Sequence, residues 1–239
     1  MITPYKNSDK NKKEQIAQMF DNIAHKYDFL NHFLSFGIDN IWRKKAIAIL
    51  KQFSPDSILD IATGTGDFAI ATSKISPKKI TGIDISVEML KIGREKIKKK
   101  GLAHLITLYE GDAENLSFPD NEFDAITVAF GVRNFENINK GLAELYRVLK
   151  PGGRLIVLEF SKPKSFPVKQ FYNIYFTRLL PFVGKMFSKD YSAYTYLPES
   201  VGAFPERDQF LDLLDQAKFT DNKYIPLSFG IAMIYVAHR

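Results

Sequence analysis

The sequence predicts an α/β protein built on a seven-stranded, mostly parallel sheet. Short apolar runs alternate with helical patterns from about residue 56 to residue 217. Such alternation is typical of parallel strands joined by helical crossovers. The last two apolar runs, 222–227 and 231–237, flank Ser228-Phe229-Gly230, which predicts an antiparallel hairpin at the C-terminal end.

The elements follow from the spacing of apolar residues, which is two along a half-buried strand and 3.6 along a helix. Helices are expected near residues 14–30, 40–52, 67–75, 86–99, 137–149 and 206–217. The parallel strands are expected near residues 56–61, 79–84, 105–110, 124–129 and 153–159. In the second helix, the side chains expected to face inward are Ile41, Trp42, Ala46, Ile49 and Leu50.

Two segments stand outside this alternation. Residues 1–52 precede the first strand and are predicted to form a helical lid, which leaves 53–239 as the core domain. Residues 161–205 interrupt the alternation and are rich in aromatic side chains, so they are interpreted as an insertion on the substrate side. Those rings would either line a greasy substrate pocket or pack as ordinary core.

Composition narrows the classes of protein. The chain has 239 residues, 45% of them hydrophobic, which is enough for one full core. It has no cysteine, which excludes disulfides and thiolate chemistry and suits the cytoplasm. No run approaches the roughly 20 apolar residues of a membrane span, and none resembles a signal peptide. The net charge of +6 fits solvated helix faces, with weak attraction to anionic lipid as the alternative. Nucleic acid is not expected as a partner, because no nucleic-acid motif is present.

A glycine-rich turn and a later acid predict a nucleoside cofactor. Gly64 and Gly66 lie in the turn after the first strand, and Asp84 ends the second strand, where a carboxylate can accept from both ribose hydroxyls. This pattern also fits a dinucleotide fingerprint. Asp60, at the end of the first strand, favours S-adenosylmethionine, since it suits an ammonium group and would repel a pyrophosphate. Thr63, Gly64 and Gly66 are expected to line the methionine part.

Three stretches of the chain resemble the ubiquinone/menaquinone biosynthesis C-methyltransferases, a family of class I, Rossmann-like, S-adenosylmethionine-dependent enzymes. The first runs from Tyr27-Asp28-Phe29-Leu30-Asn31 to Trp42, the second is Ala129-Phe130-Gly131-Val132-Arg133-Asn134, and the third runs from Arg147-Val148-Leu149-Lys150-Pro151-Gly152-Gly153 to Leu158-Glu159-Phe160-Ser161. The resemblance implies methyl transfer to a ring carbon of a polyprenylated hydroquinone, most closely a demethylmenaquinol, with a ubiquinone-pathway benzoquinol as alternative.

The chain departs from the family pattern at two positions. Asp39 stands where the family commonly has a histidine, three residues before Trp42. Ala62 stands where the general methyltransferase loop has its first glycine. The first departure leaves the role of that histidine open.

The resemblance also assigns roles to individual residues. It implies that Asp112 accepts from the adenine amino group and that the Ala113 N–H meets the ring. Alternatives are a helix-capping role for Asp84, although Ser86 is the better cap, and a turn role for Asp112. Arg133 and Asn134 are the predicted catalytic residues. Because a guanidinium stays protonated, Arg133 would stabilise a phenolate and orient a water rather than remove a proton. A surface salt bridge is the alternative for Arg133.

Further expectations concern the acceptor side and the partners. Tyr27 and His32 are expected to face substrate, with core packing as the alternative for Tyr27 and a structural or solvent-exposed place as the alternative for His32. No metal site is expected, because the histidines lack ligand spacing. The partners implied are the hydroquinone, peripheral contact with the inner face of the membrane, and a second copy in a homodimer. Rival functions are a methyltransferase for another small molecule, sterol or RNA, an NAD-dependent oxidoreductase, and a non-enzymatic binding subunit.

Overall fold

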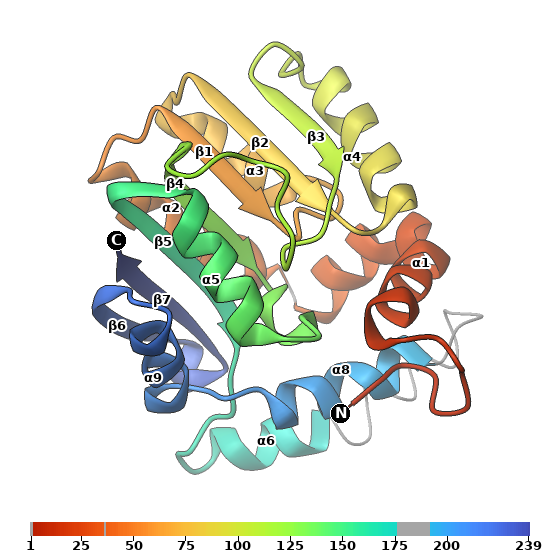
Figure 1. The fold of residues 1–239 in the computed structure, drawn as a ribbon. Coiled ribbons are helices and arrows are strands. Elements are labelled where there is room, and N and C mark those ends of the chain that lie inside the picture. Colours follow the sequence, from red (N-terminus) through yellow and green to blue (C-terminus); the bar gives the residue numbers. More distant parts are fainter. Residues whose placement is uncertain (1, 36, 176–191) are drawn as a thin grey trace.

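Seven strands form one sheet in the order β3-β2-β1-β4-β5-β7-β6 (Figure 1). The structure is a computed structural model, and residues 2–35, 37–175 and 192–239 are described. The strands are β1 (Ser57–Ile61), β2 (Lys79–Asp84), β3 (Ile106–Glu110), β4 (Phe123–Ala129), β5 (Leu149–Phe160), β6 (Thr220–Leu227) and β7 (Ala232–His238). The first five pair in parallel, while β7 runs antiparallel to both β5 and β6. The predicted sheet and its terminal hairpin are confirmed.

Helices cover both faces of the sheet, as a buried parallel sheet requires. They are α1 (Lys12–Leu34), α2 (Ile38–Lys51), α3 (Asp67–Thr72), α4 (Val87–Lys99), α5 (Ile138–Val148), α6 (Val168–Ile174), α8 (Ser192–Ala203) and α9 (Asp208–Gln216), with short 3-10 turns η1 (Ser73–Ile75), η2 (Val132–Asn134) and η4 (Ser228–Gly230). Ser86 caps α4 by accepting from the Met89 N–H at 3.2 Å, as expected.

The core consists of one layer on each side of the sheet. On one face, α2, α3 and α4 pack against the sheet through side chains such as Trp42, Phe68 and Leu90. On the other face, α5 and α9 contribute Leu142 and Phe210, among others. Because α2 belongs to the core layer, α1 is the part of residues 1–52 that extends over the carboxyl ends of the strands (Figure 1). A lid movement of this region remains a prediction.

The expectation that Ile41 faces inward is wrong. Its side chain is 53% exposed, whereas Trp42, Ala46 and Leu50 are buried as expected. The stripe of α2 that covers the sheet is filled by Trp42, Ala46, Ile47 and Leu50, which leaves Ile41 outside it.

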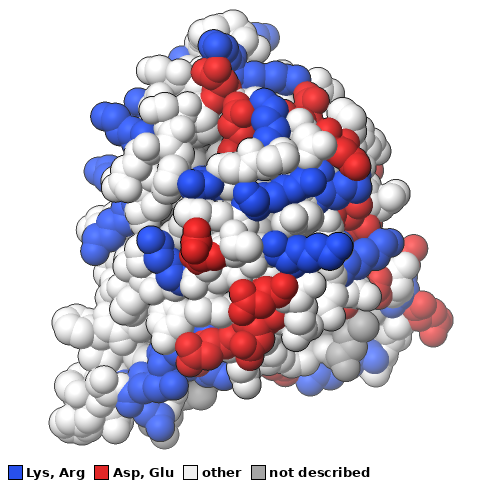
Figure 2. All heavy atoms as spheres, turned by 60° about the vertical axis from the view of Figure 1, so that its left-hand side comes forward, with Lys and Arg blue, Asp and Glu red and all other residues white. Residues whose placement is uncertain are grey.

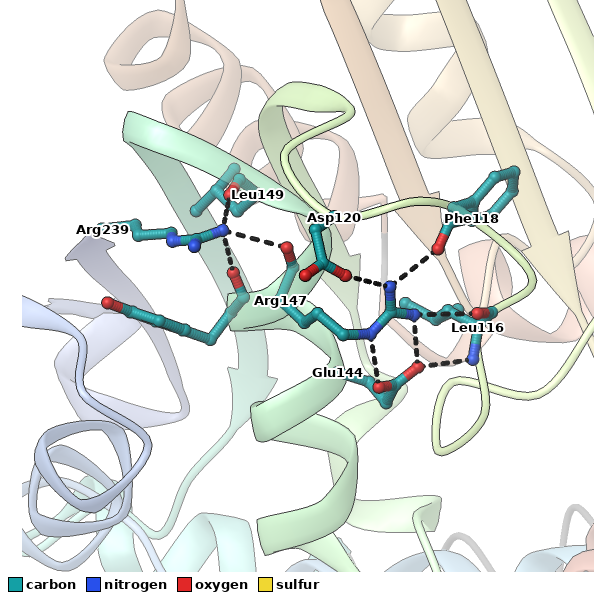
Figure 3. Close-up of polar contacts among 8 residues, drawn as sticks. Leu116, Phe118, Asp120, Glu144, Arg147, Leu149 and Arg239 are labelled. Atoms are coloured by element: carbon teal, nitrogen blue, oxygen red, sulfur yellow. Dashed lines mark hydrogen bonds and ion pairs between the residues drawn. The ribbon is translucent and has the colours of Figure 1, made fainter.

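A polar network ties together the opposite, amino ends of β4 and β5 (Figure 3). Arg147, at the end of α5, donates to both carboxylate oxygens of Glu144, to Asp120 and to the backbone carbonyls of Leu116 and Phe118. The chain's last residue, Arg239, donates to the carbonyls of Tyr146, Arg147 and Leu149. This network joins the loop before β4, the helix before β5 and the end of β7.

The charges do not collect into one large field on the face shown in Figure 2, where basic and acidic side chains are interspersed. Among the helices of the described residues, none combines the length and the apolar character that crossing a bilayer requires. In the aromatic segment 161–205, Phe176, Phe182, Phe187 and Tyr191 lie outside the described residues.

Candidate active site

The strand order reverses between β1 and β4, and ligands of open α/β sheets bind outside the carboxyl ends of the strands at such a point. The turn after β1 supplies the first wall. Gly64 has φ +56°, a left-handed conformation that glycine adopts without strain, and no atom lies within 4 Å of the Cβ it lacks. Its N–H points at the end of β2 and donates to Asp84 Oδ2 at 2.8 Å.

Asp84 is held by backbone groups and faces the cavity. Its other oxygen, Oδ1, accepts from the Ser86 N–H at 2.8 Å. Burial raises the pKa of Asp84 to about 6, although the N–H bonds from Ser86 and Gly64 act in the opposite direction. Each carboxylate oxygen therefore accepts one of these bonds and keeps acceptor capacity for a ligand hydroxyl.

Asp60 lies beneath the turn and is 1% exposed. It accepts from the Thr63 and Thr127 hydroxyls, both at 2.6 Å, and burial raises its pKa to about 6. Asp60, Thr63 and Gly66 do not line the cavity, whereas Gly64, Asp84, Asp112 and Ala113 do. Contact of the first three with a cofactor therefore stays a prediction, and their observed bonds hold the turn in shape.

The loop after β3 supplies the opposite wall. Asp112 Oδ1 accepts from the Glu114 N–H at 2.9 Å, and Oδ2 accepts from Lys13 of α1 at 2.5 Å. Burial lowers the pKa of Lys13, but the hydrogen bond and charge of Asp112 outweigh it, and the net shift is upward. Lys13 therefore stays charged and joins α1 to the rim of the cavity.

The cavity between these walls measures about 690 Å³, including the open solvent at its mouth. Its apolar walls include Ile83, Ile85, Met89 and Phe135, and α1 adds Ile16, Phe20 and Tyr27. The charged residues that line it, within the described part of the chain, are the acids Asp84, Asp112, Glu114 and Glu136 and the single base Lys13. Such a cavity favours a ligand with positive charge over a pyrophosphate.

Ala62 and Gly131 meet on the floor of the cavity. Ala62 has φ +52°, which is strained for a residue with a Cβ. A Cβ on Gly131 would lie 2.5 Å from the Ala62 Cβ, closer than carbon atoms can approach. The alanine that replaces the family's loop glycine is thus accommodated by a glycine just after β4, the strand beside β1 in the sheet.

Polar contacts fix α1 over the carboxyl edge. Asp21 accepts from the Ser86 hydroxyl at 2.6 Å, at the start of α4. Asp28 accepts from the Thr65 hydroxyl at 2.5 Å and pairs with Lys96 at 2.7 Å. Tyr27, on the same helix, lines the cavity. Its contact with substrate stays a prediction. His32 lies on α1, but its side chain is outside the described residues.

Arg133 and Glu159 form a buried ion pair beside the cavity. Arg133, in η2, has a side chain 7% exposed, and its Nη1 donates to Glu159 Oε1 at 2.8 Å and to the Phe130 carbonyl. Glu159 is fully buried, which raises its pKa, and Arg133 is the largest opposing influence. Arg133 Nε is buried and finds no hydrogen-bond partner among the described residues. The guanidinium therefore keeps donor capacity in a dry setting.

Asn134 lines the cavity and accepts from the Tyr196 hydroxyl of α8 at 3.2 Å. Burial raises the pKa of Tyr196 to about 12, so Tyr196 is a neutral donor rather than a base. Arg133 and Tyr196 line a second, adjoining cavity, which shares Phe135 and Glu136 with the first. The structure thus brings the predicted pair Arg133 and Asn134 together, with α8 of the aromatic segment beside them.

Asp39, which stands where the family commonly has a histidine, makes its bonds within the fold. It is buried, pairs with Arg43 and accepts from the Ser35 hydroxyl at 2.7 Å. Nearby, Trp42 Nε1 donates to Ser228 in the hairpin turn at 2.9 Å. The bond between Trp42 and Ser228 joins α2 to the C-terminal hairpin.

The chain matches the model of the ubiE/COQ5 methyltransferase family over residues 8–239. It belongs to that family. A demethylmenaquinone methyltransferase of Bacteroides fragilis is 52% identical over 239 residues, covering 100% of this chain and 97% of the relative. A ubiquinone/menaquinone biosynthesis C-methyltransferase of Geotalea daltonii is 45% identical over 230 residues, covering 95% of this chain and 97% of the relative.

The fold agrees with that assignment. A crystal structure of an S-adenosylmethionine-dependent methyltransferase from Aquifex aeolicus matches with a TM-score of 0.58 at 22% identity, covering 80% of this chain and 88% of that one. The predicted Rossmann-like methyltransferase fold and the suspected family are therefore confirmed, and a dehydrogenase is excluded.

Sequence reasoning missed three residues at this site: Lys13, Glu159 and Tyr196. Glu159 lies in the quoted Leu-Glu-Phe-Ser stretch, but its role depends on the pairing of Ala129 with Leu158, which brings it beside Arg133. A charged residue at the carboxyl end of an otherwise apolar strand was the signal that could have identified it.

Proposed function

We propose that this protein transfers the methyl group of S-adenosylmethionine to a ring carbon of a polyprenylated hydroquinone, with demethylmenaquinol as the acceptor. The observation that carries the proposal is the acid-lined cavity beside the Arg133–Glu159 pair. A cofactor with a sulfonium and an ammonium group suits this cavity, and an acceptor that ionises to a phenolate suits the arginine.

The residues present fit S-adenosylmethionine. Asp84 keeps acceptor capacity for the ribose hydroxyls, and Gly64 leaves open space beside it. Asp112 and Ala113 offer a carboxylate and a backbone edge for the adenine, between apolar walls that include Met89 and Phe135. When bound, the cofactor supplies an activated methyl group, so the protein mainly aligns the two reactants.

The chain's own contribution is to favour the ionised acceptor. A phenol has a pKa of about 10, and its ring carbon becomes nucleophilic once the hydroxyl loses its proton. The Arg133 guanidinium stabilises that anion. The side-chain amide of Asn134, which accepts a hydrogen bond from the Tyr196 hydroxyl, orients the anion. The phenolic proton passes to water, since neither Arg133 nor the buried Tyr196 is a base. After transfer, the hydrogen of the methylated ring carbon moves as a proton to the oxygen, so that one proton is released overall and S-adenosylhomocysteine is the second product. Only the reduced acceptor has the required hydroxyl.

The choice of acceptor rests on the relatives. Among those compared, the Bacteroides fragilis protein is named for the menaquinone reaction and the Geotalea daltonii protein for both quinone pathways. A ubiquinone-pathway benzoquinol is therefore the second candidate acceptor. A polyprenyl tail keeps the acceptor in a bilayer, so peripheral contact with the inner face of the membrane belongs to the proposal, as does a homodimer.

The test is methyl transfer from labelled S-adenosylmethionine to reduced demethylmenaquinol and reduced benzoquinol analogues, each beside its oxidised form. Label in the reduced naphthoquinol alone supports the proposal, and label in both supports a shared enzyme. Absence of label from every acceptor, with cofactor binding verified, would contradict it.

A further inference from the structure

Most of the exposed large apolar side chains belong to three segments that contact one another. Nine such side chains are at least 37% exposed within the described residues, and six of them belong to three segments: α2, the η4 turn and the stretch from Phe160 to Tyr175. We call these six the docking face: Ile38, Ile41, Phe166, Phe171, Ile174 and Phe229.

The three segments touch one another. The Trp42 indole, next to Ile41, donates to Ser228, next to Phe229. Arg207 donates to the Lys162 carbonyl at 2.8 Å and lies 3.2 Å from the position of a Cβ on Gly230. These contacts connect the η4 turn to α2 on one side and to the segment before α6 on the other. In Figure 1, α6 and the hairpin turn lie at the same end of the molecule.

The η4 turn holds its aromatic side chain outward against local preference. Ser228 and Phe229 have φ +45° and +59°, in the region that favours glycine or asparagine. The Phe229 ring is nevertheless 82% exposed, so neither backbone preference nor core packing accounts for a phenylalanine there. Phe166 is 81% exposed, so core packing does not account for its side chain either.

The exposed charged residues that belong to the three segments have one sign. The exposed charged residues of the three segments are Lys44, Lys45, Lys51, Lys162, Lys164 and Lys169. Within the same ranges the one acid is Asp39, which is buried and paired with Arg43. Glu206, which precedes Arg207 in the chain, is half-buried and accepts from the Ser161 hydroxyl and the Lys162 N–H. Aromatic rings with flanking lysines match a bilayer surface with anionic headgroups, where rings enter the interface and lysines meet the lipid charge.

We infer that the docking face is the surface by which this protein binds an anionic lipid bilayer. The inference gives a location to the membrane contact in the proposed function, and the binding it describes needs neither cofactor nor acceptor. It can therefore fail while methyl transfer stands, and the reverse also holds.

The experiment is co-sedimentation of the full chain with vesicles of phosphatidylglycerol and phosphatidylcholine, compared with phosphatidylcholine alone. We expect binding to the anionic vesicles that weakens as salt rises. Phe171→Ser and Phe229→Gly should each weaken it about tenfold through lost apolar burial, and glycine fits the φ of position 229. Tyr109→Ser is the matched control, because Tyr109 is 50% exposed on β3, at the far edge of the sheet.

A second readout locates the contact directly. A tryptophan placed by Phe229→Trp should be quenched by brominated lipid in anionic vesicles, whereas one placed by Tyr109→Trp should not. Equal vesicle binding by Phe229→Gly and the wild type would overturn the inference. The absence of vesicle binding would also overturn it. If sedimentation then showed a dimer that Phe229→Gly dissociates, a second copy of the chain, and not a bilayer, would cover the docking face.

Discussion

Two arginines from stretches that resemble the family occupy opposite edges of the sheet, and their surroundings differ. Arg147, at the amino edge, donates through Nε, Nη1 and Nη2 to two carboxylates and two carbonyls (Figure 3). Arg133, at the carboxyl edge, donates through Nη1 alone among the described residues and leaves a buried Nε without a partner. One guanidinium is saturated by its own fold, and the other retains donors.

This difference in hydrogen bonding separates a structural arginine from a candidate active-site arginine within the stretches that resemble the family. Glu144 and Asp120 raise the pKa of Arg147 further, and nothing of that group remains for a ligand. Arg133 pairs with a single carboxylate that is fully buried, beside an acid-lined cavity. Arg43, Arg154 and Arg207 also have a buried Nε without a partner among the described residues, so what sets Arg133 apart is the place of its free donor, beside the acid-lined cavity.

The largest expected effect comes from Arg133→Ala. Loss of the guanidinium should lower turnover at saturating cofactor by about 10²–10³-fold, and the buried, unpaired Glu159 should cost about 3–5 kcal/mol of stability. Steady-state kinetics and urea unfolding measure the two effects. Affinity for S-adenosylmethionine should change little, and an equal loss of affinity and turnover would remove the proposed role.

The double variant Arg133→Ala/Glu159→Ala separates the two consequences. With neither charge buried, most of the lost stability should return, while turnover stays as low as in Arg133→Ala. Recovery of turnover together with stability would mean that Arg133 acts only through the fold.

Arg147→Ala should show the opposite pattern. Loss of its charged hydrogen bonds should lower the free energy of unfolding by about 2–3 kcal/mol, with turnover of the folded protein within about twofold of wild type. Asp120→Ala is the matched control. Its side chain is 66% exposed, so it should cost less than about 1 kcal/mol. A large fall in turnover for Arg147→Ala would contradict a purely structural role for Arg147.

Asp84→Asn should weaken S-adenosylmethionine binding by about 10–100-fold, as expected for a lost charged hydrogen bond. Because burial raises the pKa of Asp84 to about 6, wild-type affinity should fall as pH drops below that value and the carboxylate becomes protonated. The variant should lack this dependence. Calorimetric titration between pH 5 and pH 8 measures both, and a flat wild-type profile would contradict the assignment.

The smallest effect concerns the floor of the cavity. Gly131→Ala should destabilise the protein by about 1–3 kcal/mol through overpacking against Ala62. Ala62→Gly should relieve its positive φ, and in the double variant it should restore most of the loss. Unfolding of the wild type, the two single variants and the double variant gives the coupling free energy between positions 62 and 131. Additive changes in the free energy of unfolding would mean that the contact between them does not cause the loss.

Local patterns carried most of the fold prediction. The alternation of strands and helices, the hairpin around Ser228-Phe229-Gly230 and the Ser86 cap are all present in the structure. The exposure of Ile41 could not be read from helical spacing, because both sides of the α2 stripe carry apolar residues and tertiary packing selects between them.

Site residues could be predicted where a single segment of the chain defines their place. They could not be predicted where two distant segments have to come together. Gly64 and Asp84 follow from the turn and the strand end, and they lie hydrogen-bonded in the cavity. Asp60 was expected to meet an ammonium group. That contact stays a prediction, and strand register adds what the sequence did not indicate, the Thr127 hydroxyl from which Asp60 accepts. Glu159 and Tyr196 reach Arg133 and Asn134 only through long-range packing.

The most direct measurement is the ionisation of a bound acceptor. A non-transferring naphthol analogue would be titrated spectroscopically in the presence of S-adenosylhomocysteine, in the wild type, Arg133→Ala and Arg147→Ala. We expect the wild type and Arg147→Ala to lower the phenol pKa below its value in water, and Arg133→Ala to return it toward that value. The same phenol pKa in all three proteins would contradict the claim that Arg133 stabilises the phenolate.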